Sequence, residues 1–156
     1  MREIKFRARG QVGRKIWYYG LLTSIGENVC HIKDENIMHE YICDTDTLGQ
    51  YTGLKDRNGK EIYEGDILLR ELYSSRDNSL FLKACFMVEF GEEGGFDMIK
   101  QYEQRDYKKW KKEYEKDKKY KQPLGSNFGV KLSEIKVIGN IYENPELLEV
   151  IEWVKH

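Results

Sequence analysis

The chain has 156 residues, and its 26 basic and 27 acidic side chains leave a net charge close to zero. That length accommodates one large domain or two very small ones. A near-zero charge supplies no global field that attracts nucleic acid or an anionic membrane, so any such attraction must be local. The apolar runs are too short to span a bilayer, and the N-terminal residues carry charge where a secretion signal is apolar. We therefore expect a cytoplasmic protein with no membrane partner.

The three cysteines, Cys30, Cys43 and Cys85, are an odd number at unrelated spacings. Such a set predicts free thiols in a reducing compartment rather than a disulfide scaffold.

The first 48 residues are rich in β-forming patterns. From Glu3 to Ala8 apolar and charged residues alternate, as in a half-buried strand. A second strand is expected over Ile16–Ile25. Asn28–Lys33 and Asn36–Cys43 follow as a hairpin around a polar turn. These patterns predict an N-terminal β unit, a hairpin or meander without a helix, over residues 1–48.

Two turns and two strands are expected after residue 48. Asp56 can hydrogen-bond forward to the backbone, and Gly59 tolerates the positive φ that closes a short hairpin loop. Glu64–Asp66 makes a second turn, after which Ile67 begins a strand. Leu80–Phe90 returns as another strand.

Residues 100–122 differ in character. They hold nine lysines and one arginine against five acids, a local balance of +5, which leaves −6 for the rest of the chain. Tyr107, Trp110 and Tyr114 stand at i, i+3 and i+7, on one face of a helix. The pattern predicts a lysine-rich helical insertion over about 100–122, ended by Pro123.

The C-terminal part is predicted to add one strand and one helix. Lys131–Tyr142 has the pattern of a strand. Asn144, Pro145 and Glu146 are typical of a helix start, and the apolar residues after them indicate a short amphipathic helix over about 145–155.

Three stretches resemble the YopX-like family of bacteriophage and prophage proteins: residues 2–8 (REIKFRA), 50–67 (QYTGLKDRNGKEIYEGDI) and 137–148 (VIGNIYENPELL). The resemblance implies phage origin and an SH3-like small barrel in the C-terminal half, residues 49–156. It carries no established activity, so no catalytic residue is carried over. At Arg9-Gly10 relatives usually have Trp-Asp, a departure that affects local packing, and the insertion is longer than usual.

One cluster has zinc-ligand residue types: Cys30, His31, His39 and Cys43. If Lys33 pairs with Asn36, Cys30 lies opposite His39, and Cys43 is about 13 Å away at ~3.3 Å per residue. At most two ligands then converge, whereas a structural zinc takes four. A hairpin with incidental Cys and His is the favoured interpretation, and no metal is expected.

Enzyme motifs are missing from the sequence. Asp56 could open a calcium loop, but the closing glutamate position is occupied by Ile67. Glu61, Glu64 and Asp66 could be imagined as acid–base carboxylates, but no histidine or nucleophile accompanies them at a suitable spacing. No phosphate-binding glycine loop or C-x-x-C is present. We expect no catalytic residues, no cofactor and no enzymatic activity.

The lysine-rich segment is the remaining candidate for a contact site. Its lysines could bind phosphate and its aromatic side chains could stack on bases. Alternatively, the aromatic stripe packs on the core while the lysines face water, and the interspersed acids favour this reading. A partner subunit is the third possibility, because Tyr and Trp are enriched at interfaces. The residues concerned are Tyr107, Lys108, Lys109, Trp110, Lys111, Lys112 and Tyr114.

The leading functional hypothesis is an accessory protein of a phage that acts by contact, as a protein-interaction or assembly module. Its partner is expected to be a phage or host protein or a second copy of the chain. Nucleic-acid binding through residues 100–122 is the alternative, and an enzyme with an unrecognised site is a third.

Overall fold

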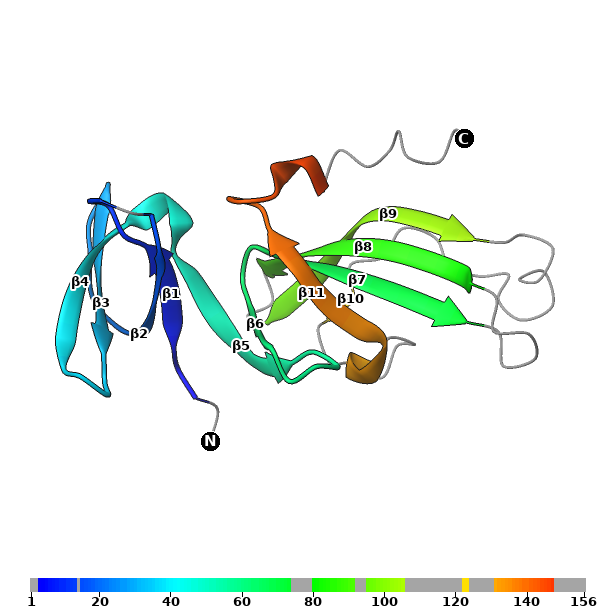
Figure 1. The fold of residues 1–156 in the computed structure, drawn as a ribbon, viewed down its shortest axis with the longest axis horizontal. Helices are drawn as coiled ribbons and strands as arrows, with labels where there is room; N and C mark the ends of the chain where they lie inside the picture. The colour runs from blue at the N-terminus through cyan, green and yellow to red at the C-terminus, as the bar shows by residue number, and fades with distance from the viewer. Residues whose placement is uncertain are drawn as a thin grey trace. The chain divides into compact units, whose positions relative to one another are not determined.

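The computed structural model describes residues 3–13, 15–73, 80–91, 95–105, 122–123 and 131–147. Within them the chain is mainly β, as the sequence predicts (Figure 1). The strands are β1 (Phe6–Arg9), β2 (Trp17–Ile25), β3 (Val29–Asp34), β4 (His39–Asp44), β5 (Gly49–Lys55), β6 (Glu61–Tyr63), β7 (Asp66–Tyr73), β8 (Leu80–Phe90), β9 (Phe96–Arg105), β10 (Gln122–Pro123) and β11 (Ile135–Asn140). Three short 3-10 turns complete it: η1 (Thr45–Thr47), η2 (Leu132–Glu134) and η3 (Pro145–Leu147).

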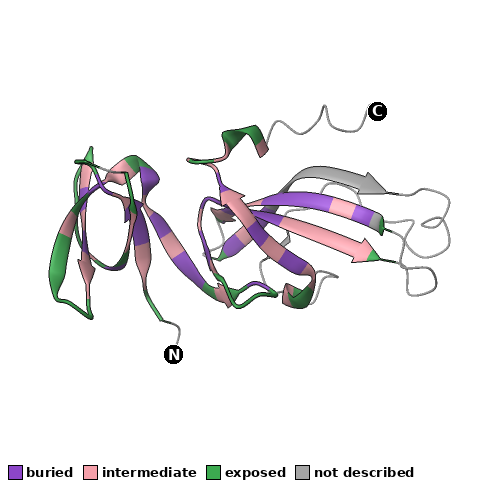
Figure 2. Ribbon diagram, viewed as in Figure 1, coloured by how far each residue is buried: buried purple, intermediate pink, exposed green. Residues whose placement is uncertain are grey.

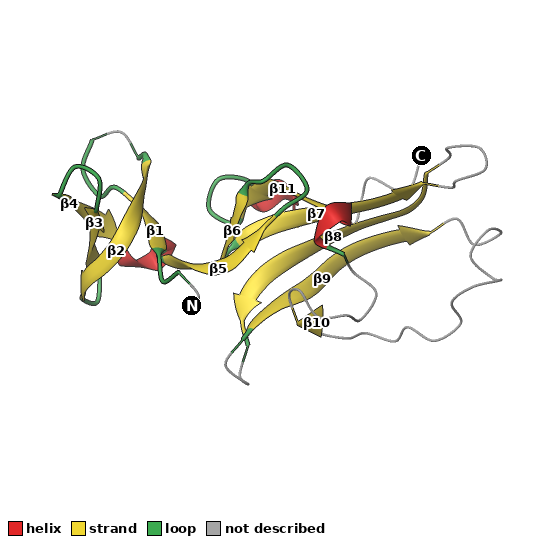
Figure 3. Cartoon of the chain, turned by 90° about the horizontal axis from the view of Figure 1, so that it is seen from below, coloured by secondary structure: helices red, strands yellow, loops and turns green. Residues whose placement is uncertain are grey.

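The chain divides into two compact units. Unit 1 contains residues 1–54 and 61–64, and unit 2 contains residues 55–60 and 65–156. Each unit has its own antiparallel sheet, and Figure 3 draws the described chain almost entirely as strands and loops.

The sheet of unit 1 has six strands in the order β4-β3-β2-β1-β5-β6. Alternate residues of β3 are buried, and the core cluster of the unit is Ala8, Cys30, Ile32 and Cys43, each 0% exposed (Figure 2). Gly10, directly after β1, forms an isolated bridge to Cys43 of the edge strand β4, which shows that the sheet curls.

Gly10 also stands where a side chain has no room. A Cβ atom added there would lie 2.8 Å from Cε2 of Tyr18, so this ring occupies the space that a side chain needs. The ring of Tyr18 stacks in turn on Tyr41, with the centroids 3.8 Å apart. The Tyr18 ring can therefore pack here only because residue 10 is a glycine.

The sheet of unit 2 has five strands in the order β10-β9-β8-β7-β11. Buried apolar side chains come from four of these strands: Ile67, Leu68, Leu82, Ala84, Cys85, Phe86, Val88, Phe96, Met98, Ile135 and Val137. They line its core.

The expected SH3-like barrel is not what these strands form: the described residues make two open antiparallel sheets. At the edge strand β11 the reason is visible. The N–H of Arg57 donates to the carbonyl of Ile135, and the N–H of Val137 donates to Asp56, so a loop takes the position that another strand would need in a closed barrel.

The helical insertion was predicted to begin at about Lys100. This prediction is wrong for the first residues of the segment. Lys100–Arg105 belong to β9, which pairs with β8 from Phe96 to Arg105. At the other end, Gln122 and Pro123 form β10 against β9. The predicted helical residues 106–121 lie outside the described residues.

The predicted C-terminal helix over about 145–155 is described only at its beginning. There the chain forms the 3-10 turn η3, Pro145–Leu147, and residues 148–155 lie outside the described residues. No α-helix occurs in the described ranges, and none of their segments has the length and apolar character of a membrane-spanning helix.

Candidate functional site

The predicted contact residues are not placed by the structure. Tyr107, Lys108, Lys109, Trp110, Lys111, Lys112 and Tyr114 all lie outside the described residues. Their roles stay predictions.

The cysteine–histidine hairpin exists, but its register differs from the predicted one. Asp34 pairs with His39, so the turn lies at residues 35–38 and Cys30 stands directly opposite Cys43. His31 pairs with Ile42 and faces away from the buried cysteines, since alternate residues of a strand point to opposite faces. Among the described residues, no three His, Cys, Asp or Glu side chains come together to hold a metal ion.

Asp56 is a buried carboxylate of unit 2 with three backbone hydrogen bonds. It is 6% exposed, and its oxygens accept from the N–H groups of Asn58, Lys60 and Val137 at 2.8, 2.9 and 2.9 Å. Burial alone raises the pKa of this carboxyl, but the three hydrogen bonds outweigh it and hold the pKa below its ordinary value. Gly59 has φ 80°, as the turn prediction requires. The turn thus anchors the loop to β11.

The opening stretch of the family motif packs on the second stretch within unit 1. Arg7 is 4% exposed, and its guanidinium carbon lies 4.8 Å from the ring centroid of Trp17 and 4.9 Å from that of Tyr63. Its Nη2 donates to the carbonyl of Glu64 at 3.2 Å. Arg7 thus joins β1 to the residues around β6.

Glu61 is engaged in the same cluster. Its carboxylate pairs with the ammonium of Lys5 at 2.8 Å and accepts from the hydroxyl of Tyr63 at 2.7 Å. Burial, followed by the hydrogen bond and negative charge of Glu61, raises the pKa of Tyr63. These contacts give Glu61 a role in holding β1 and β6 together.

The third family stretch meets the second within unit 2. The N–H of Ile141 donates to the carbonyl of Gly65 at 2.9 Å, and Gly65 has φ 80° beside the ring of Tyr142. The buried Asn140 accepts from the N–H groups of Tyr142 and Glu143 at 3.0 Å each. Residues of the third stretch therefore hold the end of β11 to the turn before β7.

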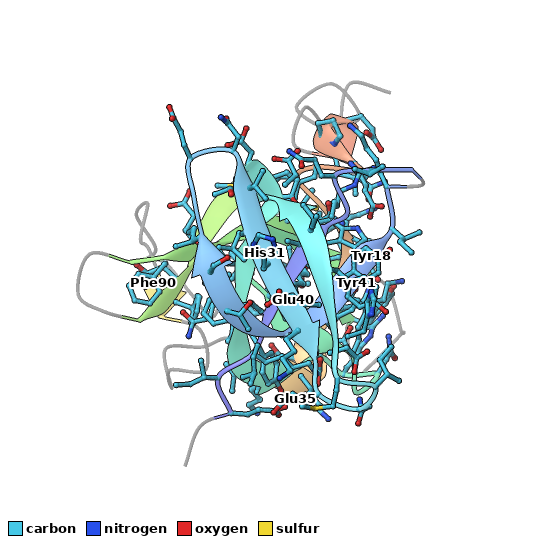
Figure 4. All side chains as sticks on the ribbon, turned by 90° about the vertical axis from the view of Figure 1, so that its left-hand side faces the viewer. Tyr18, His31, Glu35, Glu40, Tyr41 and Phe90 are labelled. Atoms are coloured by element: carbon cyan, nitrogen blue, oxygen red, sulfur yellow. The ribbon has the colours of Figure 1, made fainter. Side chains whose placement is uncertain are left out.

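A different surface of unit 1 is exposed and mixed in character. We define the outer face as Leu21, Thr23, Ser24, His31, Lys33, Glu40 and Ile42, side chains of β2, β3 and β4 that point away from the buried cysteines. Figure 4 looks onto this face, and His31 and Glu40 lie on it. Leu21 is 38% and Ile42 52% exposed.

Polar contacts link the three strands of the outer face. Ser24 Oγ lies 2.6 Å from Nδ1 of His31, and the hydroxyl of Thr23 bonds to the carboxylate of Glu40. A hydroxyl–imidazole pair can in principle act as a nucleophile, but acyl transfer also needs donors aimed at the developing oxyanion. The neighbour of His31 on β4 is Ile42, an apolar side chain. This arrangement suits binding.

Sequence reasoning did not single out the outer face. The predicted pairing of Lys33 with Asn36 and the observed pairing of Asp34 with His39 both assign His31, Glu40 and Ile42 to one side, because the two registers differ by an even number of residues. The sequence did not mark the bulge between Leu22 and Ser24, which decides the side chains that β2 contributes.

The described residues form an antiparallel β protein of two units, in which several residues of the three sequence stretches hold strands and turns together. Residues 5–149 match the model of the YopX protein family, and the chain belongs to that family. The crystal structure of protein EF1440 from Enterococcus faecalis is similar, with 22% identity, 95% of this chain and 99% of that chain covered, and a TM-score of 0.48. None of the curated proteins matches the chain.

Proposed function

We propose that this protein works by binding another protein through the outer face of unit 1. The exposure of Leu21 and Ile42 on neighbouring rows of the face carries the proposal. Scattered exposed apolar residues are ordinary, whereas apolar residues that share one sheet face are a feature of interaction sites.

The composition of the face supports a protein as the partner. Lys33 and Glu40 are directly opposite each other and of opposite sign, so the face offers no concentrated positive charge for a phosphate backbone. Thr23, Ser24 and His31 supply hydrogen-bonding groups between the two apolar side chains, so a partner needs both apolar and polar groups. The proposed role is that of a phage accessory protein in the bacterial cytoplasm, with a phage or host protein or a second copy as partner.

The test compares two variants of the full chain. Leu21→Asp with Ile42→Asp places two charges in the face, whereas Ile37→Asp changes a residue that is 63% exposed in the β3–β4 turn, outside the face. Affinity purification from infected cells and sedimentation velocity then measure partner capture and self-association. Wild type and the Ile37 variant should retain the same partner or oligomer, and the double variant should lose it. A wild-type monomer that captures nothing, or equal behaviour of all three proteins, contradicts the proposal.

A second candidate function rests on the lysine-rich segment, residues 100–122. Its local charge of +5, from ten basic and five acidic side chains, contrasts with the mixed charges of the outer face. Lysine clusters of this kind bind nucleic acid through phosphate contacts.

A further inference from the structure

Cys30 and Cys43 are directly opposite each other on the adjacent antiparallel strands β3 and β4. The N–H of Gln11 donates to the carbonyl of Ile42, so Ile42 points its backbone groups away from β3 and its neighbour Cys43 points them toward β3. Cys30 and Cys43 therefore form a hydrogen-bonded pair, for which the Cα atoms are about 5.5 Å apart. Disulfides span Cα separations of about 4.4–6.8 Å.

The two thiols are close and protected. Both cysteines are free and 0% exposed. Burial raises the pKa of each thiol, to about 11 for Cys43, and the charge of Cys30 is the second cause of the rise at Cys43. The raised pKa values mean that both folded thiols are protonated and react slowly.

The sulfur atoms are nevertheless turned apart. Sγ of Cys43 lies 3.6 Å from the carbonyl of Tyr41, while the thiol of Cys30 hydrogen-bonds with Thr45, toward the opposite end of the hairpin. A bond between them requires side-chain rotation within a hydrogen-bonded pair. Disulfides with such strain are more easily reduced than structural ones.

We propose that Cys30 and Cys43 are a redox-active dithiol that is converted to a cross-strand disulfide by exchange with a low-molecular-weight disulfide such as oxidised glutathione. One cysteine, as thiolate, attacks the glutathione disulfide and releases the first glutathione thiolate. The second cysteine, as thiolate, attacks the protein sulfur of the mixed disulfide and releases the second. The two protons lost by the cysteines end on the two glutathione molecules, so one disulfide is reduced and one is formed.

Access to the pair comes through β4. This strand is at the edge of the sheet, and an isolated bridge at Gly10 covers its outer side at Cys43. Edge strands that are held weakly open locally far more often than the whole domain unfolds. Oxidation then fixes β4 to β3 at the position next to Ile42 and His31. The inference does not depend on the proposed binding role of the outer face.

The experiment equilibrates the full chain in glutathione buffers of increasing oxidised fraction, followed by thiol alkylation and peptide mapping by mass spectrometry. Equilibrium is approached both from the folded protein and by refolding from denaturant, so that burial of the thiols cannot block the reaction. The expected product is a Cys30–Cys43 cross-linked peptide lacking two hydrogen atoms, which excess reduced glutathione restores to two thiols. Amide exchange in β3 and β4 should be slower in the oxidised form.

Cys85 provides the matched control. It is buried in β8 and is paired with Leu69 and Tyr102, so no cysteine faces it. Cys85→Ala should leave the reaction unchanged, and Cys43→Ala should abolish it. If Cys30 and Cys43 stay fully alkylatable in the oxidising buffer after both approaches, or if cross-links to Cys85 form as readily, the proposal is overturned.

Discussion

The carboxylate of Asp56 accepts hydrogen bonds from three backbone N–H groups, those of Asn58, Lys60 and Val137. In Asp56→Asn the amide oxygen can replace only one carboxylate oxygen, and the amide nitrogen faces a donor. We expect the free energy of unfolding to fall by about 2–3 kcal/mol, measured by urea denaturation. Asp46→Asn, at an exposed position in η1, is the control and should change it by less than about 0.5 kcal/mol. Equal effects of the two substitutions would contradict the assigned role.

The lowered pKa of Asp56 also predicts a pH dependence. Because the folded pKa lies below the ordinary 3.8, the unfolded chain binds more protons in that range. The contribution is therefore complete above the unfolded pKa and is lost as the pH falls through the folded pKa. The free energy of unfolding of wild type should fall on acidification below about pH 4, as Asp56 becomes protonated. The part of this fall that comes from Asp56 should be absent in Asp56→Asn. Parallel curves for both proteins would exclude Asp56 as its source.

Met38 has φ 55°, in the left-handed region that favours glycine. Its side chain is 67% exposed, so little packing offsets the backbone strain. We expect Met38→Gly to raise the free energy of unfolding by about 1 kcal/mol, measured by thermal and urea denaturation. A decrease would show that the methionine side chain contributes a stabilising contact in the turn.

At the scale of elements, Gly65 and Gly59 are a matched pair. Both have φ 80°, but a Cβ at Gly65 would lie 3.1 Å from the ring of Tyr142, whereas one at Gly59 meets nothing within 4 Å. Gly59→Ala should cost about 1 kcal/mol of backbone strain. Gly65→Ala should cost about 2–3 kcal/mol, because crowding against the ring adds to that strain. Urea denaturation of both variants measures the difference, and equal costs would mean that the ring simply moves aside.

Most strands were predictable because their side chains alternate, and Leu80–Phe90 is observed with the predicted bounds. The register between β3 and β4 was not predictable. The turn between them has Met38 at the positive-φ position, where glycine or asparagine would usually signal the turn. The start of the insertion failed for a different reason. Lys100–Arg105 have no strand pattern of their own but pair along the eleven-residue strand β8, so sheet pairing overrides local composition.

The candidate site was only partly predictable: its local turn could be predicted from the sequence, but the outer face could not. The motif turn with Asp56 and Gly59 is confirmed, because its chemistry is local. The outer face combines side chains from three strands, and the side chains that β2 contributes depend on a bulge between Leu22 and Ser24. A bulge shifts every later side chain to the other face and leaves no clear mark in the sequence.

For the whole molecule, charge distribution separates the two candidate functions. Residues 100–122 carry +5 within a chain of net charge −1. If this segment binds nucleic acid, the chain should be retained on single-stranded DNA or RNA at low ionic strength, and retention should fall steeply with salt because counterions are released. Fluorescence anisotropy with a labelled oligonucleotide over a salt series measures this.

Two variants with the same net charge test whether the binding of nucleic acid is local to residues 100–122. One variant neutralises four lysines of the segment to glutamine: Lys108, Lys109, Lys111 and Lys112. The control neutralises four exposed lysines elsewhere: Lys15, Lys55, Lys60 and Lys131. A local site loses affinity and salt dependence only in the first variant, whereas a general electrostatic attraction weakens equally in both. If wild type shows no binding at low salt, nucleic acid is excluded and the outer face becomes the surface on which to look for a partner.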